Sequence, residues 1–233
     1  MLQTVRQGGV SGGSYASLNL GDHVGDDAAA VAANRERVLR RIGAQPLWLQ
    51  QVHGATVAIA ETAASGVEAD AAIARMPNRA CVVMTADCLP VLLCDRAGTA
   101  VAAVHAGWRG LCAGIIERTV TAMRIPGEEL LAWLGPAIGA DVFEVGAEVR
   151  SAFMTHSPEA VAAFAPAKAD KWLADIGLLA RQRLYSVGVT AIYGGGWCTV
   201  TEPDRFFSYR RDGITGRMAT FIWLKHHSKL QPV

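Results

Sequence analysis

The stretch 84–110 constrains the fold of this chain more than any other. Two uninterrupted apolar runs, Val91–Cys94 and Ala100–Val104, are separated by the turn residues Asp95–Gly98. Short apolar runs bounded by turn signals are typical of buried strands. We therefore expect an antiparallel hairpin, in which the start of the first strand lies beside the end of the second.

This hairpin places two reactive side chains at one end. Cys88 precedes the first strand, and His105 ends the second. Pro90 cannot donate a ladder hydrogen bond, so it predicts a bend close to Cys88. A further histidine, His53, ends the strand-like run 47–52 and is followed by a glycine. We expect all three side chains to contribute to one site.

Length and composition favour a single α+β domain over residues 1–233. The chain has 233 residues, of which 51% are hydrophobic, and this is enough to bury a sizeable core. Strands and helices interleave without a regular βαβ repeat, which predicts a mixed β-sheet layered with α-helices. A formal net charge of +1 gives no sign of a nucleic-acid-binding or acidic-lipid-binding surface.

The cysteines and the apolar segments point to a reducing compartment. The five cysteines are odd in number and irregularly spaced, which argues against a disulfide framework. The N-terminal segment has no continuous apolar core of signal-peptide length, and no stretch of about 18 apolar residues occurs. We therefore expect a cytoplasmic protein without a membrane span.

Local signals predict the main helices. Asp26 or Asp27 caps a helix that ends at Gly43, and a second helix is expected over 111–123. A third, with Ile176 on its apolar side, is expected to end near Gly188. The segment 61–80 has mixed character and is predicted to be loop, with its part 68–74 passing close to the site.

The three candidate residues match the ligand preferences of zinc. Two imidazoles and one thiolate suit Zn²⁺, and three protein ligands leave a fourth position for water or substrate. The same set occurs in blue-copper sites. However, a multicopper oxidase needs many imidazoles, and six histidines without a His-x-His pair are too few. We expect the remaining histidines of the second half, His156, His226 and His227, to be solvated surface groups.

Several polar residues are candidates for binding a substrate. Arg109 follows His105 by four residues and offers a forked donor to an anion. Arg35 and Arg210 are further candidates, although each is equally consistent with a salt-bridged surface residue. Asp87 is either a proton donor or acceptor, or a carboxylate that caps a turn.

Many motifs in order resemble those of the bacterial laccase-domain (YfiH-like) family. They run from Ser17 to Leu224 and read SLNLGDHVGDD, NRERV, QVHG, ADA, TADCLPVLLCD, AAVHAGWRGL, GPAIG, FEVG and RFFSYRRDGITGRMA. Members have been labelled polyphenol oxidases, purine nucleoside phosphorylases and peptidoglycan-editing factors. The metal triad of the family maps onto His53, Cys88 and His105. One departure is Phe207, where members often have a tyrosine.

The resemblance implies a fold and an activity. The fold would be a mixed sheet with flanking helices, related to the cysteine-hydrolase-like toxin deamidase fold. The activity would be zinc-dependent phosphorolysis of adenosine, inosine, guanosine and methylthioadenosine, with adenosine deamination beside it. The usual zinc-deaminase signature is missing, so deamination is implied by the resemblance alone. We expect purine nucleosides and phosphate as substrates, and a monomer or weak homo-oligomer.

Two other functions remain open at this point. Cys88 can act as a nucleophile with His105 as its base, which would suit an amide hydrolase that edits peptidoglycan precursors. Alternatively, the chain is a zinc-stabilised binding module without activity. The open coordination position argues against that last reading.

Overall fold

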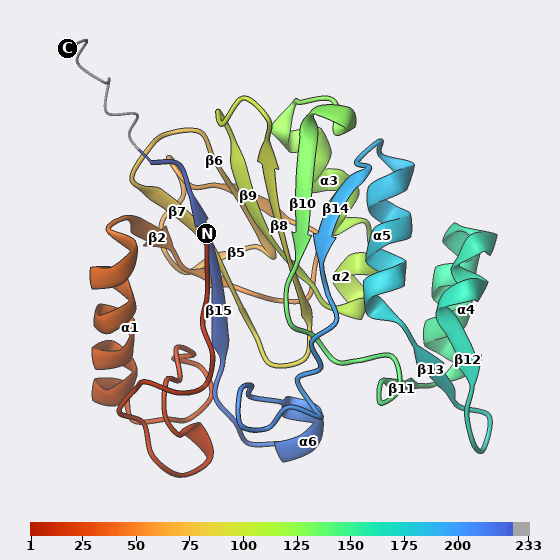
Figure 1. Cartoon of the computed structure of the whole chain (residues 1–233), viewed down its shortest axis with the longest axis horizontal. Helices are drawn as coiled ribbons and strands as arrows, with labels where there is room; N and C mark the ends of the chain where they lie inside the picture. The colour runs from red at the N-terminus through yellow and green to blue at the C-terminus, as the bar shows by residue number, and fades with distance from the viewer. Residues whose placement is uncertain (226–233) are drawn as a thin grey trace.

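Two mixed β-sheets lie face to face in the computed structural model, which describes residues 1–225 (Figure 1). The larger sheet has the order β14 (Ala191–Gly194), β10 (Leu130–Leu134), β8 (Leu89–Asp95), β9 (Val101–Ala106), β6 (Ala71–Ala74) and β4 (Val57–Ile59). The smaller sheet has the order β1 (Leu2–Gln3), β15 (Met218–Trp223), β7 (Arg79–Thr85) and β2 (Gln45–Leu47). Two minor sheets comprise β11 (Glu144–Val145), β13 (Trp172–Ala174) and β12 (Phe164–Pro166), and β3 (Leu49–Gln50) with β5 (Val67–Glu68).

Helices cover the outer faces of both large sheets. Helix α1 (Ala28–Ile42) packs on the smaller sheet, whereas α2 (Trp108–Cys112), α3 (Ile115–Met123) and α5 (Ile176–Ser186) pack on the larger one. The remaining helical segments are α4 (Ala147–His156), α6 (Tyr209–Asp212) and the 3-10 turns η1 (Gly13–Tyr15), η2 (Gly127–Glu129) and η3 (Pro158–Ala163). The expected α+β arrangement of mixed sheets and helices is therefore confirmed. No helix in residues 1–225 is long and apolar enough to cross a membrane.

The first helix has the predicted bounds. The Asp27 carboxylate accepts a hydrogen bond of 2.8 Å from the Ala30 N–H, which satisfies one of the free donors at the helix start. Gly43 ends the helix with φ 62°, a left-handed conformation that glycine adopts without strain.

The predicted hairpin is also present. Strands β8 and β9 pair antiparallel, and Pro90 lies opposite His105. The His105 N–H points away from β8 and donates to the carbonyl of Asp70. Pro90 and His105 therefore exchange no backbone hydrogen bond, and a proline is tolerated in β8 opposite β9. The Pro90 carbonyl accepts from Gly135, just beyond the end of β10. The proline therefore needs no donor toward β9, and the return bond to Gly135 that it cannot make falls beyond the end of β10.

Three local predictions need correction. The bend expected close to Cys88 is present, but it is made at Asp87 (φ 106°) and not at Pro90, and it sends β7 and β8 into different sheets. The segment 61–80 is not all loop, because β6 is an inner strand between β9 and β4. Its Ala-Ala-Ile-Ala sequence has little intrinsic strand preference, and burial on both faces decides its structure. The helix predicted over 111–123 is divided in two at Gly114, which has φ 86°.

The layer between the two large sheets is built mainly from small side chains. Val83 of β7 and Leu92 of β8 fill part of it. Alanines fill most of the rest and bring the sheets close together: Ala58, Ala60, Ala69, Ala72, Ala74 and Ala103. The layer therefore has no space for a longer side chain.

We predict that Ala103→Leu lowers the free energy of unfolding by about 1–3 kcal/mol, because three extra carbons must displace neighbours in a packed layer. Urea unfolding followed by circular dichroism measures this change. Ala97→Leu, in the exposed turn of the hairpin, is the matched control and should stay within about 0.5 kcal/mol of the wild type. Equal stability of the two variants would contradict the packing described here.

Candidate metal centre

Strand alternation directs the candidate side chains into one end of the layer between the sheets. Val101 and Ala103 of β9 face this layer, so His105, two residues further on, faces the same way. Ala72 of β6 also faces it, and therefore so does Asp70. On β8 the same alternation runs back from Leu92 to Cys88.

The three residues proposed from the sequence lie together in the structure. The ligand atoms of His53, Cys88 and His105 are all within 4.8 Å of one another. Cys88 Sγ is 3.9 Å from His53 Nε2, and the two imidazole ring centroids are 4.8 Å apart at an interplanar angle of 77°. His105 is buried and His53 is exposed, so the site opens to solvent on the His53 side.

A buried carboxylate, Asp70, holds two of these residues in place. One of its oxygens accepts a hydrogen bond of 2.8 Å from His105 Nδ1. The same carboxylate accepts from three consecutive N–H groups, those of Val52, His53 and Gly54, at 3.3, 2.9 and 2.7 Å. The turn that carries His53 therefore wraps around an anion, in the manner of a backbone nest. His53 adopts φ 59° within this turn.

Two glycines allow the chain to pass close to the triad. A Cβ atom on Gly107 would lie 3.0 Å from Cys88 Sγ and 3.0 Å from His53 Cδ2. A Cβ atom on Gly110 would lie 2.6 Å from the carbonyl oxygen of Gly54. A larger residue at Gly110 would force the backbone of α2 and the His53 turn apart, whereas one at Gly107 would crowd the side chains of Cys88 and His53.

The buried groups carry complementary charges. Burial disfavours charge on the Cys88 thiol, but the nearby His105 imidazolium and the hydrogen bonds of both histidines outweigh it and lower the pKa to about 6. Burial likewise disfavours charge on His105, but Cys88 and Asp70 raise its pKa to about 9. For Asp70, burial is outweighed by hydrogen bonds from His105 and Gly54, and the pKa is lowered. A thiolate and an imidazolium therefore face each other over an ionised carboxylate.

This donor set fits a metal ion. Because Asp70 occupies Nδ1 of His105, the other ring nitrogen is left to face Cys88 and His53. A carboxylate behind a ligating histidine fixes its tautomer and its ring orientation. Two nitrogens and one sulfur are ligands that Zn²⁺ binds in tetrahedral sites with an open fourth position.

Asp87 accepts hydrogen bonds that link the chain beside Cys88 to other segments. One oxygen accepts from the Thr199 hydroxyl and the other from the Arg210 N–H, both at 2.6 Å. Its carbonyl accepts from the Ile138 N–H. The residue beside Cys88 is therefore fastened to three distant segments.

The three arginines proposed for substrate binding differ in their surroundings. Arg109 is exposed and lies over the Trp108 ring, 4.4 Å from its centroid. Arg35 contacts Asp22 at 3.1 Å and the Leu20 carbonyl at 2.9 Å, and it stacks on Trp48.

Arg210 donates to the Glu144 carbonyl at 3.0 Å and stacks on Phe143. The side chain of Arg109 therefore has the greatest freedom to meet a ligand.

Sequence reasoning missed two residues of the site. Asp70 stands immediately before a buried strand in the Ala-Asp-Ala motif, and an ionisable residue at such a position was the available signal. The other is Arg217, whose charge interacts with those of Cys88 and Asp87. It lies far from the triad in sequence, and no spacing links the two.

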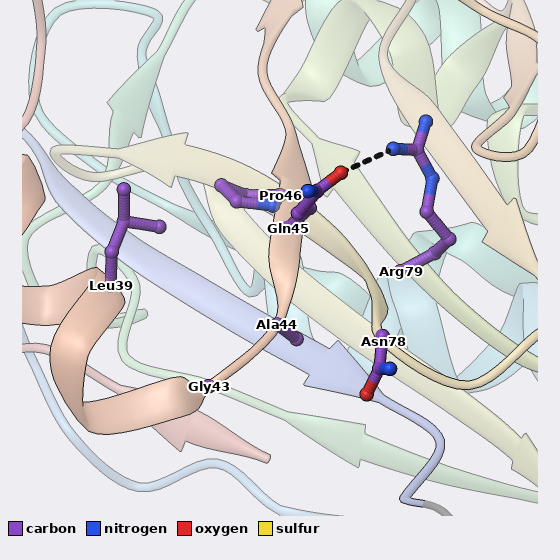
Figure 2. Close-up of a pocket in the computed structure, with 7 residues that line it drawn as sticks. All are labelled: Leu39, Gly43, Ala44, Gln45, Pro46, Asn78 and Arg79. Atoms are coloured by element: carbon purple, nitrogen blue, oxygen red, sulfur yellow. Dashed lines mark hydrogen bonds between the residues drawn. The ribbon is translucent and has the colours of Figure 1, made fainter.

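A pocket of about 530 Å³ lies away from the triad (Figure 2). It is formed by the end of α1, by β2 and by the start of β7. Its most polar pair, Arg79 and Gln45, is joined by a hydrogen bond of 3.3 Å. No histidine, cysteine or carboxylate lines this pocket, so it offers no metal-ligating or nucleophilic side chain.

Comparison with known sequences identifies the class of this domain as laccase-like. Residues 1–225 match the family described as multi-copper polyphenol oxidoreductase laccase. The chain therefore belongs to this family, as the sequence motifs indicated.

Named relatives and solved structures cover almost the whole chain. A purine nucleoside phosphorylase of Pseudomonas aeruginosa is 55% identical over 95% of this chain and 92% of its own length. The purine nucleoside phosphorylase YfiH of Escherichia coli is also 55% identical, with the same coverage. The Neisseria meningitidis protein NMB0706 superposes with a TM-score of 0.94 at 55% identity, covering 96% of this chain and 93% of its own. YlmD of Geobacillus stearothermophilus superposes with a TM-score of 0.90 at 31% identity, covering 96% of this chain and 91% of its own.

Replacing Asp70 tests its supporting role. We predict that Asp70→Asn lowers zinc affinity by about 10- to 100-fold, because the amide cannot accept all the hydrogen bonds that position His105 and the His53 turn. Competition with a chromophoric chelator measures this affinity, with circular dichroism as the check on folding. Glu68→Gln, an exposed carboxylate two residues away, is the control. Unchanged affinity in a folded Asp70→Asn protein would contradict the assignment.

The charge state of Cys88 predicts its pH-dependent reactivity in metal-free protein. Alkylation by iodoacetamide should be half-maximal near pH 6 and should level off above it, since only the thiolate reacts. Mass spectrometry of the modified peptide measures the rate. Cys112, whose pKa burial raises, provides the internal comparison. A midpoint for Cys88 near the ordinary thiol value of about 8.5 would be inconsistent with the ion pair.

Proposed function

We propose that the chain is a cytoplasmic, zinc-dependent purine nucleoside phosphorylase. The observation that carries this proposal is the His53–Cys88–His105 triad, in a chain 55% identical to proteins named purine nucleoside phosphorylase. The proposed substrates are adenosine, inosine, guanosine and methylthioadenosine, each with phosphate. We also retain the expectation of a monomer or a weak homo-oligomer.

Zinc is favoured over the copper that the family description mentions. Within residues 1–225, the triad is the group of three or more His, Cys, Asp and Glu residues whose geometry suits a metal ion. A multicopper oxidase must house several coppers, largely on imidazoles. One cluster with two imidazoles supports a single ion of the kind that catalytic zinc sites bind.

Phosphorolysis exchanges one bond at the anomeric carbon of the ribose. A phosphate oxygen forms a bond to C1′ while the bond from C1′ to the base nitrogen breaks. The bonding electrons leave with the base, which takes up a proton, and the products are free base and ribose-1-phosphate. When bound by the triad, zinc would supply Lewis-acid stabilisation of negative charge.

The side chains around the triad have defined tasks in this scheme. Asp70 keeps His105 in one tautomer and one orientation. Arg109 offers its guanidinium to an anion at the exposed rim, with Arg35 and Arg210 as further proposed substrate contacts. Asp87 remains the proposed proton donor or acceptor, and its two short hydrogen bonds fix its position.

Adenosine deaminase activity is the finer part of the proposal. Water would replace the amine on the purine ring, with release of ammonia. Its support is the resemblance to the laccase-domain family, because the His-x-Glu and Pro-Cys-x-x-Cys elements of known zinc deaminases are missing from the sequence.

A second candidate is a cysteine amide hydrolase that edits peptidoglycan precursors. Cys88, His105 and Asp70 have the order of a nucleophile, a base and an orienting carboxylate. A thiol with pKa about 6 beside a buried imidazolium is an activated nucleophile. This arrangement also supports the proposed relation to the toxin deamidase fold.

Purified protein should contain about one zinc per chain and should release ribose-1-phosphate from inosine and phosphate. Cys88→Ala should lose both the metal and the turnover, whereas Cys112→Ala on α2 should keep both. Elemental analysis and chromatography of the products measure the two quantities. Full metal occupancy in Cys88→Ala would contradict the assignment of the triad as the zinc site. Chelator-resistant amide hydrolysis that a thiol alkylator abolishes would favour the second candidate.

A further inference from the structure

A half-buried arginine near the triad, Arg217, is not used by the scheme above. It stands immediately before β15, whose first residue, Met218, pairs with Thr85 at the end of β7. Continuing this antiparallel register by one residue sets Arg217 opposite Ala86, two residues from Cys88. The charge of Arg217 interacts with those of Cys88 and Asp87, which agrees with this placement.

The guanidinium is held in place but only partly used. Its Nη1 donates to the carbonyls of Thr215 and Gly216, at 3.0 and 3.1 Å. Within residues 1–225, its Nε and Nη2 atoms donate no hydrogen bond to another protein group, and it forms no salt bridge with a carboxylate. Burial lowers the pKa of Arg217, but an arginine stays protonated at neutral pH. Arg217 is therefore a fixed, half-buried cation with two donor nitrogens, Nε and Nη2, that the protein does not use.

The surroundings of Arg217 are arranged around its extended side chain. Gly21 lies against it, since a Cβ atom there would be 2.7 Å from Arg217 Cγ. The Arg217 N–H donates to Asn19 Oδ1 at 2.8 Å, so the backbone is fixed as well. Exposed Tyr209 lies beside the guanidinium, with its ring centroid 6.0 Å away. The cation is therefore positioned before any ligand arrives.

Arg217 is not simply the counter-ion of Asp87. Both Asp87 oxygens already accept short hydrogen bonds, from Thr199 and from the Arg210 N–H. The other arginines of this region are either engaged or exposed. Arg35 pairs with Asp22, and Arg109 lies at the surface over Trp108.

We propose that Arg217 binds the phosphate co-substrate beside the triad, through the guanidinium donors that the protein leaves free. This assignment rests on the proposed phosphorylase function. A planar guanidinium matches two oxygens of a phosphate and holds it in one orientation. Arg217 is then the anchor for the attacking anion, with Arg109 at the outer rim.

Direct binding and steady-state kinetics test this proposal in the zinc-loaded protein. Arg217→Met should weaken binding of inorganic phosphate in equilibrium dialysis, and raise the KM for phosphate, by about 10- to 100-fold. The KM for inosine and the zinc content should stay within about twofold. Arg217→Lys keeps the charge without the fork and should show a smaller rise in the KM for phosphate. Arg118→Met, on the exposed side of α3, is the matched control.

Each outcome decides the inference. An unchanged KM for phosphate, or an equal rise for phosphate and inosine, would overturn it, as would loss of zinc from either variant. If Arg217→Met does not fold, the KM values of Arg217→Lys decide. If the wild type forms no ribose-1-phosphate, the proposed function fails, and dialysis still decides whether Arg217 binds phosphate. A wild type that does not bind phosphate overturns the inference.

Discussion

The structure of the site depends on one buried carboxylate. Asp70 accepts hydrogen bonds from three consecutive backbone N–H groups and from His105 Nδ1. A buried charge is costly unless it is fully hydrogen-bonded, and here the hydrogen bonds satisfy it. The same bonds orient one imidazole and fix the turn that carries another. Asp70, which is outside the triad, thus positions both histidines and favours the charged form of His105.

The two sheets make this arrangement possible. The alanine-rich layer brings them close, and strand alternation sends His105, Cys88 and Asp70 to the same end of it. A shift of one residue in the pairing of β8 with β9 would turn His105 away from the layer. Pro90 fits opposite His105 because these two residues exchange no backbone hydrogen bond, which helps to define this register.

Much of this could be predicted from the sequence, and the failures have physical reasons. The hairpin, the first helix and the triad follow from apolar runs, from a cap with Asp27 and Gly43, and from ligand chemistry. Strand β6 was missed because four small residues carry little strand signal, and burial between β9 and β4 decides their structure. Asp70 and Arg217 reach the site through tertiary packing. Nothing in the sequence around Asp70 specifies His105, 35 residues away, and nothing around Arg217 specifies Cys88.

The bonds of Asp87 have a consequence for how the protein is made. All three residues of the triad lie between residues 53 and 105, in the first half of the chain. Yet Asp87 is held by Thr199 and by the backbone of Arg210, and β7 is flanked by β15, the last strand. A ribosome that has released only the first half of the chain therefore presents the triad residues and Asp70 without the bonds that fix Asp87 beside Cys88. The surroundings of the triad are completed by the segments translated last, so under the proposed zinc-dependent function the finished fold, rather than the nascent chain, would acquire the ion.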